Sequence, residues 1–412
     1  MSEFQQRLAD REANFEVMPA NSLVTSADRA AQYSIFRKMV GGTPLLLIPC
    51  GNSRIWAKFE MDSPTENHYD RANLFMLYLL ENEGVIKPGD TIFEGTSGSA
   101  GRSLAYFCNR LGFKLDILVP QEMDPVRKSE IEYFGANVIS AQEPGGIGSV
   151  VKEYGQRQLD LINARVKRIK FTKNGSKVNT YLSDDKVVCY SNHAESLFTP
   201  KAMGDIAKET ALQIPSDTRI DTYIGTLGNG SSIKGISEAL REIYMDVRVI
   251  GTEDITAPVH TLVKYGEQWF LNNYGYLPQS KDQAGKVKVH DVPGTSVWGY
   301  HPPFVELDNI DEIRIPNNTA WRELQKQYND AAWQAHHHSN YIGRTSAQNL
   351  LVAQEFGGKY PGRNILIVFF DRADQYSDYP PTSYRQPTPP FEDMFDFVRS
   401  YKSRLIPGVK LS

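Results

Sequence analysis

Three titratable side chains lie within four consecutive residues of the chain: Glu66, His68 and Tyr69. A carboxylate, an imidazole and a phenol so close together could exchange protons with a ligand, and a tyrosine can act as a general acid if its pKa is lowered. Glu94 would add a fourth titratable group. We therefore take Tyr69, His68 and Glu66 as candidate catalytic residues. The alternative is that they are ordinary solvated side chains of a polar loop.

A turn rich in glycine and hydroxyl groups follows this segment after a short interval. It separates a predicted strand at residues 91–94 from a predicted helix at about 101–111. Backbone N–H groups and hydroxyls at the start of a helix attract an anion. We expect the turn to bind an anionic ligand, although such a turn can also be purely structural. Its candidate ligand-binding residues are Thr96, Ser97, Gly98, Ser99 and Gly101.

A second loop of this kind lies between a predicted strand at residues 223–225 and a predicted helix at 233–243. Its glycines would let the backbone approach an anion closely, and its polar side chains would add hydrogen-bond donors. Alone such a loop is a weak signal, but in this position we expect it to bind a phosphate or a similar anion. The candidate residues are Gly228, Asn229, Gly230, Ser231 and Ser232.

Predicted strands and helices alternate along most of the chain. This alternation predicts an α/β fold with mostly parallel sheets covered by helices. One segment, residues 168–181, instead alternates in period two around Asn174-Gly175, which predicts a β-hairpin with a tight turn. Strands are expected at 54–59, 91–94, 115–120, 137–139, 221–224, 247–252 and 364–370, and helices at 70–82, 101–111, 126–134 and 233–243.

Composition excludes several classes of function. The 412 residues can hold two or three domain-sized cores, and a charged fraction of 23 % is typical of a soluble globular protein. A net charge of −4 gives no bulk attraction to nucleic acid or to an anionic membrane, so we expect neither as a partner. No apolar run reaches the roughly 18 residues of a membrane span.

The cysteines and histidines give no sign of a disulfide framework or a metal site. Cys50, Cys108 and Cys189 are far apart, and the first residues lack the pattern of a signal peptide, which together predict a cytoplasmic protein. Three consecutive histidines, residues 336–338, would point in different directions on a helix and cannot all bind one ion. We therefore expect no metal.

Several segments, taken in order, resemble the fold-type II pyridoxal phosphate (PLP) enzymes, the family of cysteine synthase, cystathionine β-synthase and threonine synthase. The resemblance covers roughly residues 40 to 375. In this family a segment close to Asn-Pro-Thr-Gly-Ser-x-Lys-Asp-Arg carries the lysine that forms a Schiff base with PLP, and Tyr69 stands at the position of that lysine. The matching segments are residues 42–45, 57–60, 63–71 and 88–98.

The resemblance also implies roles for the loops. Loop 96–101 would hold the α-carboxylate of a substrate, and loop 228–232 would hold the cofactor phosphate. Thr345 or Ser346 would meet the pyridine nitrogen, with a helix N-cap as the alternative role. The family fold implies a homodimer, a large domain of residues 1–72 and 200–412, and a small domain of residues 73–199. The hairpin, at about 165–185, looks like an insertion into the small domain.

Four positions depart from the family pattern. Glu66 and Asn67 replace a glycine and a serine, Tyr69 replaces the lysine, and Ser99 replaces an asparagine that contacts the cofactor ring oxygen. A phenol has no amine and cannot form an imine. PLP could therefore bind only non-covalently, or a different phosphorylated ligand takes its place.

Three hypotheses about function follow. We expect an enzyme that acts on a small amino-acid-like or phosphorylated ligand without an internal aldimine. Conventional PLP-dependent β-elimination or β-replacement is the alternative, and it would need an amine from elsewhere, for which Lys58 is the nearest candidate in sequence. A non-catalytic binding or scaffold homologue is the third.

Overall fold

The fold is that of a computed structural model, which describes residues 26–377 except 172–176, 184–185, 284, 286–287, 289–291, 293, 301 and 335–340. The chain divides into two compact units, and each is described by itself. The first unit holds residues up to Gly41 and Ser63–Ala202, and the second holds Gly42–Asp62 and the chain from Met203 onward. Residues 26–41 and 63–72, which the sequence analysis assigned to the larger domain, group instead with the first unit.

The first unit is built on a sheet of six strands in the order β5-β4-β3-β8-β7-β6. Strands β5, β4, β3 and β8 are parallel to their neighbours in this series, whereas β7 is antiparallel to both β8 and β6. The strands are β3 (Thr91–Gly95), β4 (Lys114–Val119), β5 (Asn137–Ser140), β6 (Lys167–Phe171), β7 (Val178–Ser183) and β8 (Lys186–Tyr190).

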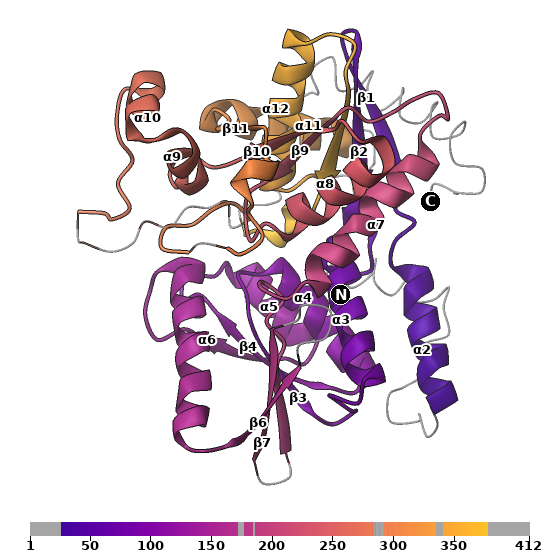
Figure 1. The fold of residues 1–412 in the computed structure, drawn as a ribbon, viewed down its shortest axis with the longest axis vertical. Helices are drawn as coiled ribbons and strands as arrows, with labels where there is room; N and C mark the ends of the chain where they lie inside the picture. The colour runs from indigo at the N-terminus through magenta and orange to yellow at the C-terminus, as the bar shows by residue number, and fades with distance from the viewer. Residues whose placement is uncertain are drawn as a thin grey trace. The chain divides into compact units, whose positions relative to one another are not determined.

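Helices cover both faces of this sheet (Figure 1). On one face the core joins Leu77 and Leu104 to Ile92, and on the other it joins Val150 to Phe93. Ile92 and Phe93 are consecutive residues of one strand, so they point to opposite faces. The helices are α2 (Ser26–Met39), α3 (Tyr69–Asn82), α4 (Ser99–Leu111), α5 (Pro125–Tyr133) and α6 (Gly146–Asn163).

Local sequence signals set the ends of these helices. Gly112 adopts a left-handed conformation (φ 77°) that ends α4. Asp124 precedes α5, and its carboxylate accepts a hydrogen bond from the N–H of Val126 at 2.9 Å. Pro125 follows as the first helical residue, where its missing N–H costs no hydrogen bond.

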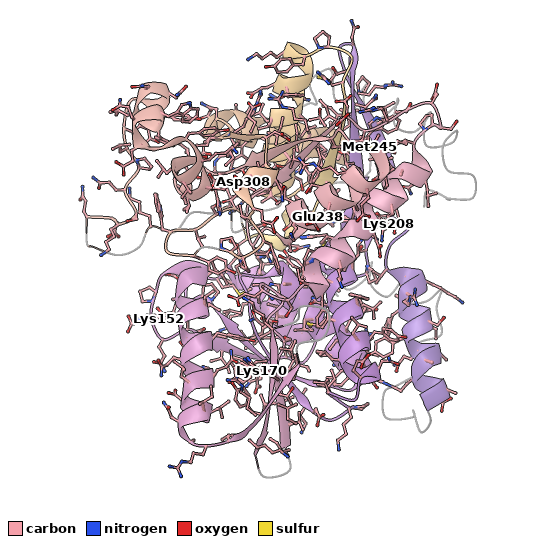
Figure 2. All side chains as sticks on the ribbon, viewed as in Figure 1. Lys152, Lys170, Lys208, Glu238, Met245 and Asp308 are labelled. Carbon is pink, nitrogen blue, oxygen red and sulfur yellow. The ribbon has the colours of Figure 1, made fainter. Side chains whose placement is uncertain are left out.

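The predicted hairpin strands are present as β6 and β7. They pair antiparallel from Lys167 with Leu182 to Phe171 with Val178. Strand β6 forms the edge of its sheet, and Lys170 on it is exposed, as is Lys152 on α6 (Figure 2). Lysines on an edge strand discourage pairing with other chains. The Asn174-Gly175 turn lies outside the described residues.

The second unit is built on another six-stranded sheet, in the order β1-β2-β12-β9-β10-β11. Strand β1 pairs antiparallel with β2, and every other pair is parallel. The strands are β1 (Leu45–Cys50), β2 (Ser53–Phe59), β9 (Thr222–Thr226), β10 (Arg248–Thr252), β11 (Glu312–Arg314) and β12 (Asn364–Phe369).

The core of the second unit joins helices α11 and α12 to the sheet. Trp321 and Phe356 on these helices belong to the same buried cluster as Ile55, Ile224 and Ile367 on the strands. Helix α7 runs across the boundary between the two units. The helices are α7 (Phe198–Gln213), α8 (Ser231–Tyr244), α9 (Val259–Tyr265), α10 (Glu267–Tyr274), α11 (Asn318–Gln334) and α12 (Arg344–Lys359), with 3₁₀ turns η2 (Glu60–Asp62), η4 (Leu307–Asn309) and η6 (Ala373–Gln375).

The predicted α/β alternation is confirmed, with all seven expected strands and all four expected helices within a few residues of their predicted positions. None of the helices within the described ranges has the length and apolar character to cross a membrane. The three histidines at 336–338 lie outside the part of the chain that the structure describes.

Truncation of the central strand of the second unit should be costly. Ile367 on β12 is fully buried, so Ile367→Ala should lower the free energy of unfolding by about 3 kcal/mol through lost burial and the cavity it leaves. Leu212 on α7 is 87 % exposed, and Leu212→Ala is the control with a change near zero. Urea denaturation followed by circular dichroism measures both, and equal effects would contradict this packing.

Candidate active site

Tyr69 is the first residue of α3, and the loop before it is fixed by its own side chains. The amide oxygen of Asn67 accepts a hydrogen bond from the N–H of Tyr69 at 2.9 Å. The Asn67 amide nitrogen in turn donates to the hydroxyl of Thr65 at 2.9 Å. Asn67 therefore sets the backbone position from which the Tyr69 side chain projects.

Asp70 anchors the same loop from the first turn of α3. Its fully buried carboxylate accepts hydrogen bonds from the N–H of Thr65, at 2.7 Å, and from the Thr65 hydroxyl. Burial raises the pKa of Asp70 to about 6, although the bonds from Thr65 and the charge of Arg102 act in the opposite direction.

Glu66 holds the loop against helix α4. Its backbone has a positive φ of 59°, a conformation that suits the glycine of the family pattern better than a glutamate. The buried carboxylate lies 3.1 Å from the guanidinium of Arg102, which also pairs with Glu130 at 3.3 Å. Because Glu66 is engaged with Arg102, its contacts fit the positioning of the loop better than proton transfer.

The ring of Tyr69 contacts the rings of two histidines. The ring of His68 is tilted against it with centroids 4.3 Å apart, and the ring of His193 meets it nearly edge-on at 5.5 Å. Sequence analysis missed His193, which lies more than one hundred residues along the chain. The local sequence gives no motif for it, because only the pairing of β8 with β3 brings the loop after β8 to this place.

Glu94 orients His193. Nδ1 of His193 lies 3.2 Å from the Glu94 carboxylate, which also accepts the N–H of His193 at 3.0 Å and the hydroxyl of Ser191 at 2.6 Å. Burial alone would raise the pKa of Glu94, but the electrostatic interaction with His193 and the hydrogen bonds from His193 and Ser191 outweigh it. The pKa is held below its ordinary value. An ionised carboxylate on one nitrogen of the imidazole leaves the other nitrogen for a ligand.

The first anion loop begins two residues after Glu94. Thr96 uses its hydroxyl to accept the N–H of Gly98 at 3.1 Å. Gly98 has a φ of 149°, which favours glycine, and α4 begins at the next residue. Gly101 lies against the sheet, where an added Cβ would come within 2.6 Å of Ile117 and Thr96. Ser97, which lies between Thr96 and Gly98, is partly exposed. Asn73 on α3 donates to the carbonyl of Ala100 at 2.9 Å and ties the loop to the Tyr69 helix.

A buried arginine lies against this loop. A guanidinium nitrogen of Arg127 on α5 donates to the hydroxyl of Ser99, and an added Cβ at Gly98 would meet the guanidinium carbon at 2.4 Å. Arg127 thus places a positive charge beside the start of α4, where backbone N–H groups already favour an anion. The sequence analysis did not single out Arg127. Its position in the first turn of α5, the helix that follows α4, was the only sequence feature that could have indicated it.

The second anion loop, residues 228–232, opens α8 in the second unit. Gly230 adopts a left-handed conformation with φ 82°. The loop backbone is packed closely on both sides, since an added Cβ at Gly228 would meet the carbonyl oxygen of Gly294 at 2.4 Å. One at Gly230 would meet the backbone of Phe304 at 2.6 Å.

Thr345 and Ser346 start helix α12 in the same unit. The Ser346 hydroxyl is buried and accepts the N–H of Phe370 at 3.0 Å, so it acts within the fold. Thr345 packs its methyl group against Gly294, where an added Cβ would come within 2.7 Å. Gly294 thus lies next to both Gly228 and Thr345, which places loop 228–232 and the start of α12 close together.

Two lysines that could offer an amine to this unit are engaged. Lys58 is fully buried, and its Nζ bonds to the carbonyl of Thr43 at 2.7 Å, to Gln213 at 2.9 Å and to Glu209 at 2.8 Å. Lys234, in the first turn of α8, pairs with Glu238 and Glu306. Partial burial would lower the pKa of Lys234, but those two bonds outweigh it and raise the pKa, so the amine stays protonated.

The described part of the chain contains no group of three or more histidine, cysteine or carboxylate side chains arranged to hold a metal ion. Tyr69, His68, His193 and Glu94 lie in the first unit together with the anion loop that follows Glu94.

The pKa of Asp70 predicts a pH dependence of stability. The folded state holds a proton on Asp70 up to about pH 6, whereas the unfolded state releases it near pH 4, so wild-type stability falls as the pH rises between these values. Asp70→Asn should therefore gain about 2 kcal/mol relative to wild type between pH 4 and pH 7. Urea denaturation at both pH values measures the difference. A difference that does not change, or that changes in the opposite direction, would contradict the burial of this carboxyl.

Comparison with known proteins places the chain in a family. The sequence profile of the family described as pyridoxal-phosphate dependent enzyme matches residues 36–269. Cysteine synthase B of Campylobacter jejuni is 25 % identical over 346 residues, which cover 82 % of this chain and 95 % of that protein. The match spans both the Tyr69 segment and the loop 228–232.

Solved structures show the same fold. A hydrogen sulfide-producing enzyme from Fusobacterium nucleatum is 22 % identical with a TM-score of 0.63, covering 89 % of this chain and 96 % of the other. An O-acetylserine dependent cystathionine β-synthase from Helicobacter pylori is 22 % identical with a TM-score of 0.62, covering 83 % and 96 %. The two parallel-rich α/β sheets are those of the fold-type II enzymes, and the chain belongs to the family of pyridoxal-phosphate dependent enzymes.

Proposed function

We propose that the chain is an enzyme that binds a small amino-acid-like or phosphorylated anion and catalyses acid–base chemistry without a Schiff base to PLP. The observation that carries the proposal is the position of Tyr69. Its ring lies against His193, whose imidazole pairs with the buried Glu94, and an anion loop begins two residues after Glu94. An imidazole paired with a carboxylate can accept a proton from a ligand, and a phenol beside it can donate one.

The residues present fit PLP at one end only. When bound through an imine, PLP withdraws electrons from the substrate α-carbon. The aldehyde needs a lysine amine, but Tyr69 has none and Lys58 is buried among three partners. Loop 228–232 has the glycine conformation and the helix start that suit a phosphate. We therefore assign this loop to a phosphate group, whether of non-covalent PLP or of another phosphorylated ligand.

The substrate would be held in the first unit by its negative charge. Backbone N–H groups at the start of α4 and the guanidinium of Arg127 offer donors to a carboxylate beside Ser97, Gly98 and Ser99. Glu66 and Asn67 keep the Tyr69 backbone in place from the other side of the loop. Tyr69, His68 and His193 would then face the group that reacts.

Without an imine to PLP, the site has no group that withdraws electrons from the substrate, and this limits the reactions it can catalyse. An amino-acid Cα–H bond is too weakly acidic for an imidazole or phenol base alone, so we place the chemistry at a more reactive bond. An ester on the side chain of serine is such a bond, and one solved relative is named for its dependence on O-acetylserine. Water would add to the ester carbonyl and pass its proton to His193. As the carbon–oxygen bond breaks, Tyr69 would give its proton to the serine oxygen and regain one from His193. Serine and acetic acid are released, and the acid loses its proton to water to give acetate.

Conventional β-replacement is the alternative, and the cysteine synthase relatives favour it. It requires a lysine imine in this chain, whereas the proposed acid–base route requires only the Tyr69 hydroxyl and the His193 imidazole. A non-catalytic role would leave O-acetyl-L-serine unchanged. The reaction products therefore separate the three possibilities, because hydrolysis gives serine, replacement with sulfide gives cysteine, and a binding protein gives neither.

Loss of either proton-transfer group should slow this hydrolysis. Tyr69→Phe and His193→Gln should each lower kcat for O-acetyl-L-serine by about 100-fold or more, since a general acid or base contributes at least that factor. His260→Gln is a matched control, because His260 forms a similar buried pair with Glu253 at 2.8 Å in the second unit. Proton NMR of released acetate measures the rates. No hydrolysis by the wild type, or equal rates in all variants, would refute the proposal.

A further inference from the structure

Asn229 already occupies hydrogen-bond donors of the second anion loop. Its amide oxygen accepts the N–H of Ser231 at 3.0 Å and the Ser231 hydroxyl at 2.7 Å. Both donors belong to the first residue of α8, where an anion bound to this loop would take its hydrogen bonds. The neutral amide oxygen of Asn229 therefore accepts two hydrogen bonds that a bound anion would otherwise accept.

The loop backbone leaves little freedom to avoid this competition. Gly228 lies against the carbonyl of Gly294, and Gly230 lies against the backbone of Phe304 and Val305. A shift of the loop in either direction would meet these segments. The Asn229 side chain is only partly buried, so rotation of its amide is the cheaper way to release the Ser231 donors.

We propose that Asn229 is an internal competitor that sets the charge a ligand must carry to bind loop 228–232. Hydrogen bonds to a charged acceptor are about twice as strong as those to a neutral one, so a phosphate dianion can displace the amide oxygen. A singly charged carboxylate gains less from the exchange. Every anion pays the same free energy to displace Asn229, so the residue sets an affinity threshold that a phosphate dianion passes more easily than a carboxylate. This inference rests on the phosphate that the proposed function assigns to the loop, but not on the Tyr69 chemistry.

A titration with inorganic phosphate tests this role. Asn229→Ala removes the competing oxygen and should tighten phosphate binding about fivefold, the factor that corresponds to one lost capping bond. Asn229→Asp keeps the shape but adds a negative charge, and should weaken binding by at least the same factor. Isothermal titration gives the affinities, and the backbone amide resonance of Ser231 reports whether phosphate has replaced Asn229.

Asn317 provides the matched control. Its amide oxygen accepts the N–H groups of Thr319 and Ala320, both at 3.0 Å, at the start of α11 in the same unit. Asn317→Ala removes a comparable cap and should leave phosphate affinity unchanged. Parallel titrations with pyridoxal 5′-phosphate, pyridoxal and acetate distinguish a phosphate on the cofactor from free phosphate, and either from a carboxylate. Binding of pyridoxal as tight as that of pyridoxal 5′-phosphate would overturn the assignment of the loop to phosphate.

Two further results would overturn the inference. One is unchanged or weaker phosphate binding in Asn229→Ala, and the other is no phosphate binding by the wild type or any variant. Neither depends on turnover, and Tyr69 and His193 are intact in every variant. A protein that fails to hydrolyse O-acetyl-L-serine but shows the expected order of phosphate affinities would refute only the acid–base proposal.

Discussion

The site depends on the buried polar contacts that fix residues 63–70 at the start of α3. Asp70 accepts two hydrogen bonds from Thr65, Asn67 accepts the N–H of Tyr69, and Glu66 pairs with Arg102 on α4. Unpaired buried charges are costly, so each of these groups constrains the others. The family pattern places a glycine where Glu66 lies, and the positive φ of Glu66 is a conformation that glycine adopts readily. These contacts fix the backbone from which the Tyr69 phenol projects at the start of α3.

A phenol at position 69 would depend for its reactivity on the titratable side chains around it. An internal aldimine would make the cofactor the source of reactivity, and the protein would mainly orient it. In the proposed acid–base chemistry, reactivity would come from titratable side chains, and the rings of His68 and His193 contact Tyr69 while the buried Glu94 pairs with His193. The charge of Arg127 beside the anion loop fits an acidic ligand. In the second unit Asn229 and Ser231 form a closed pair at the loop that the family uses for phosphate.

Local sequence predicted much of the fold and part of the site. Strands such as residues 364–369 and helices with clear caps, such as α5 after Asp124, follow from patterns within a few residues. Loops 96–101 and 228–232 were found because glycine and hydroxyl residues cluster at strand-to-helix turns. His193 and the engagement of Lys58 could not be found in this way, because both depend on contacts between residues far apart in the chain. The ion pair of Glu66 with Arg102 has the same origin.

The central claim is that no side chain of this protein captures the aldehyde of PLP. The most direct measurement is borohydride reduction of the full-length protein incubated with pyridoxal 5′-phosphate, followed by peptide mass spectrometry. We predict no stoichiometric pyridoxyl adduct on any lysine, Lys58 and Lys234 included, and no absorbance band near 410–430 nm before reduction. A stoichiometric pyridoxyl adduct on one lysine, with loss of such a band on reduction, would contradict it.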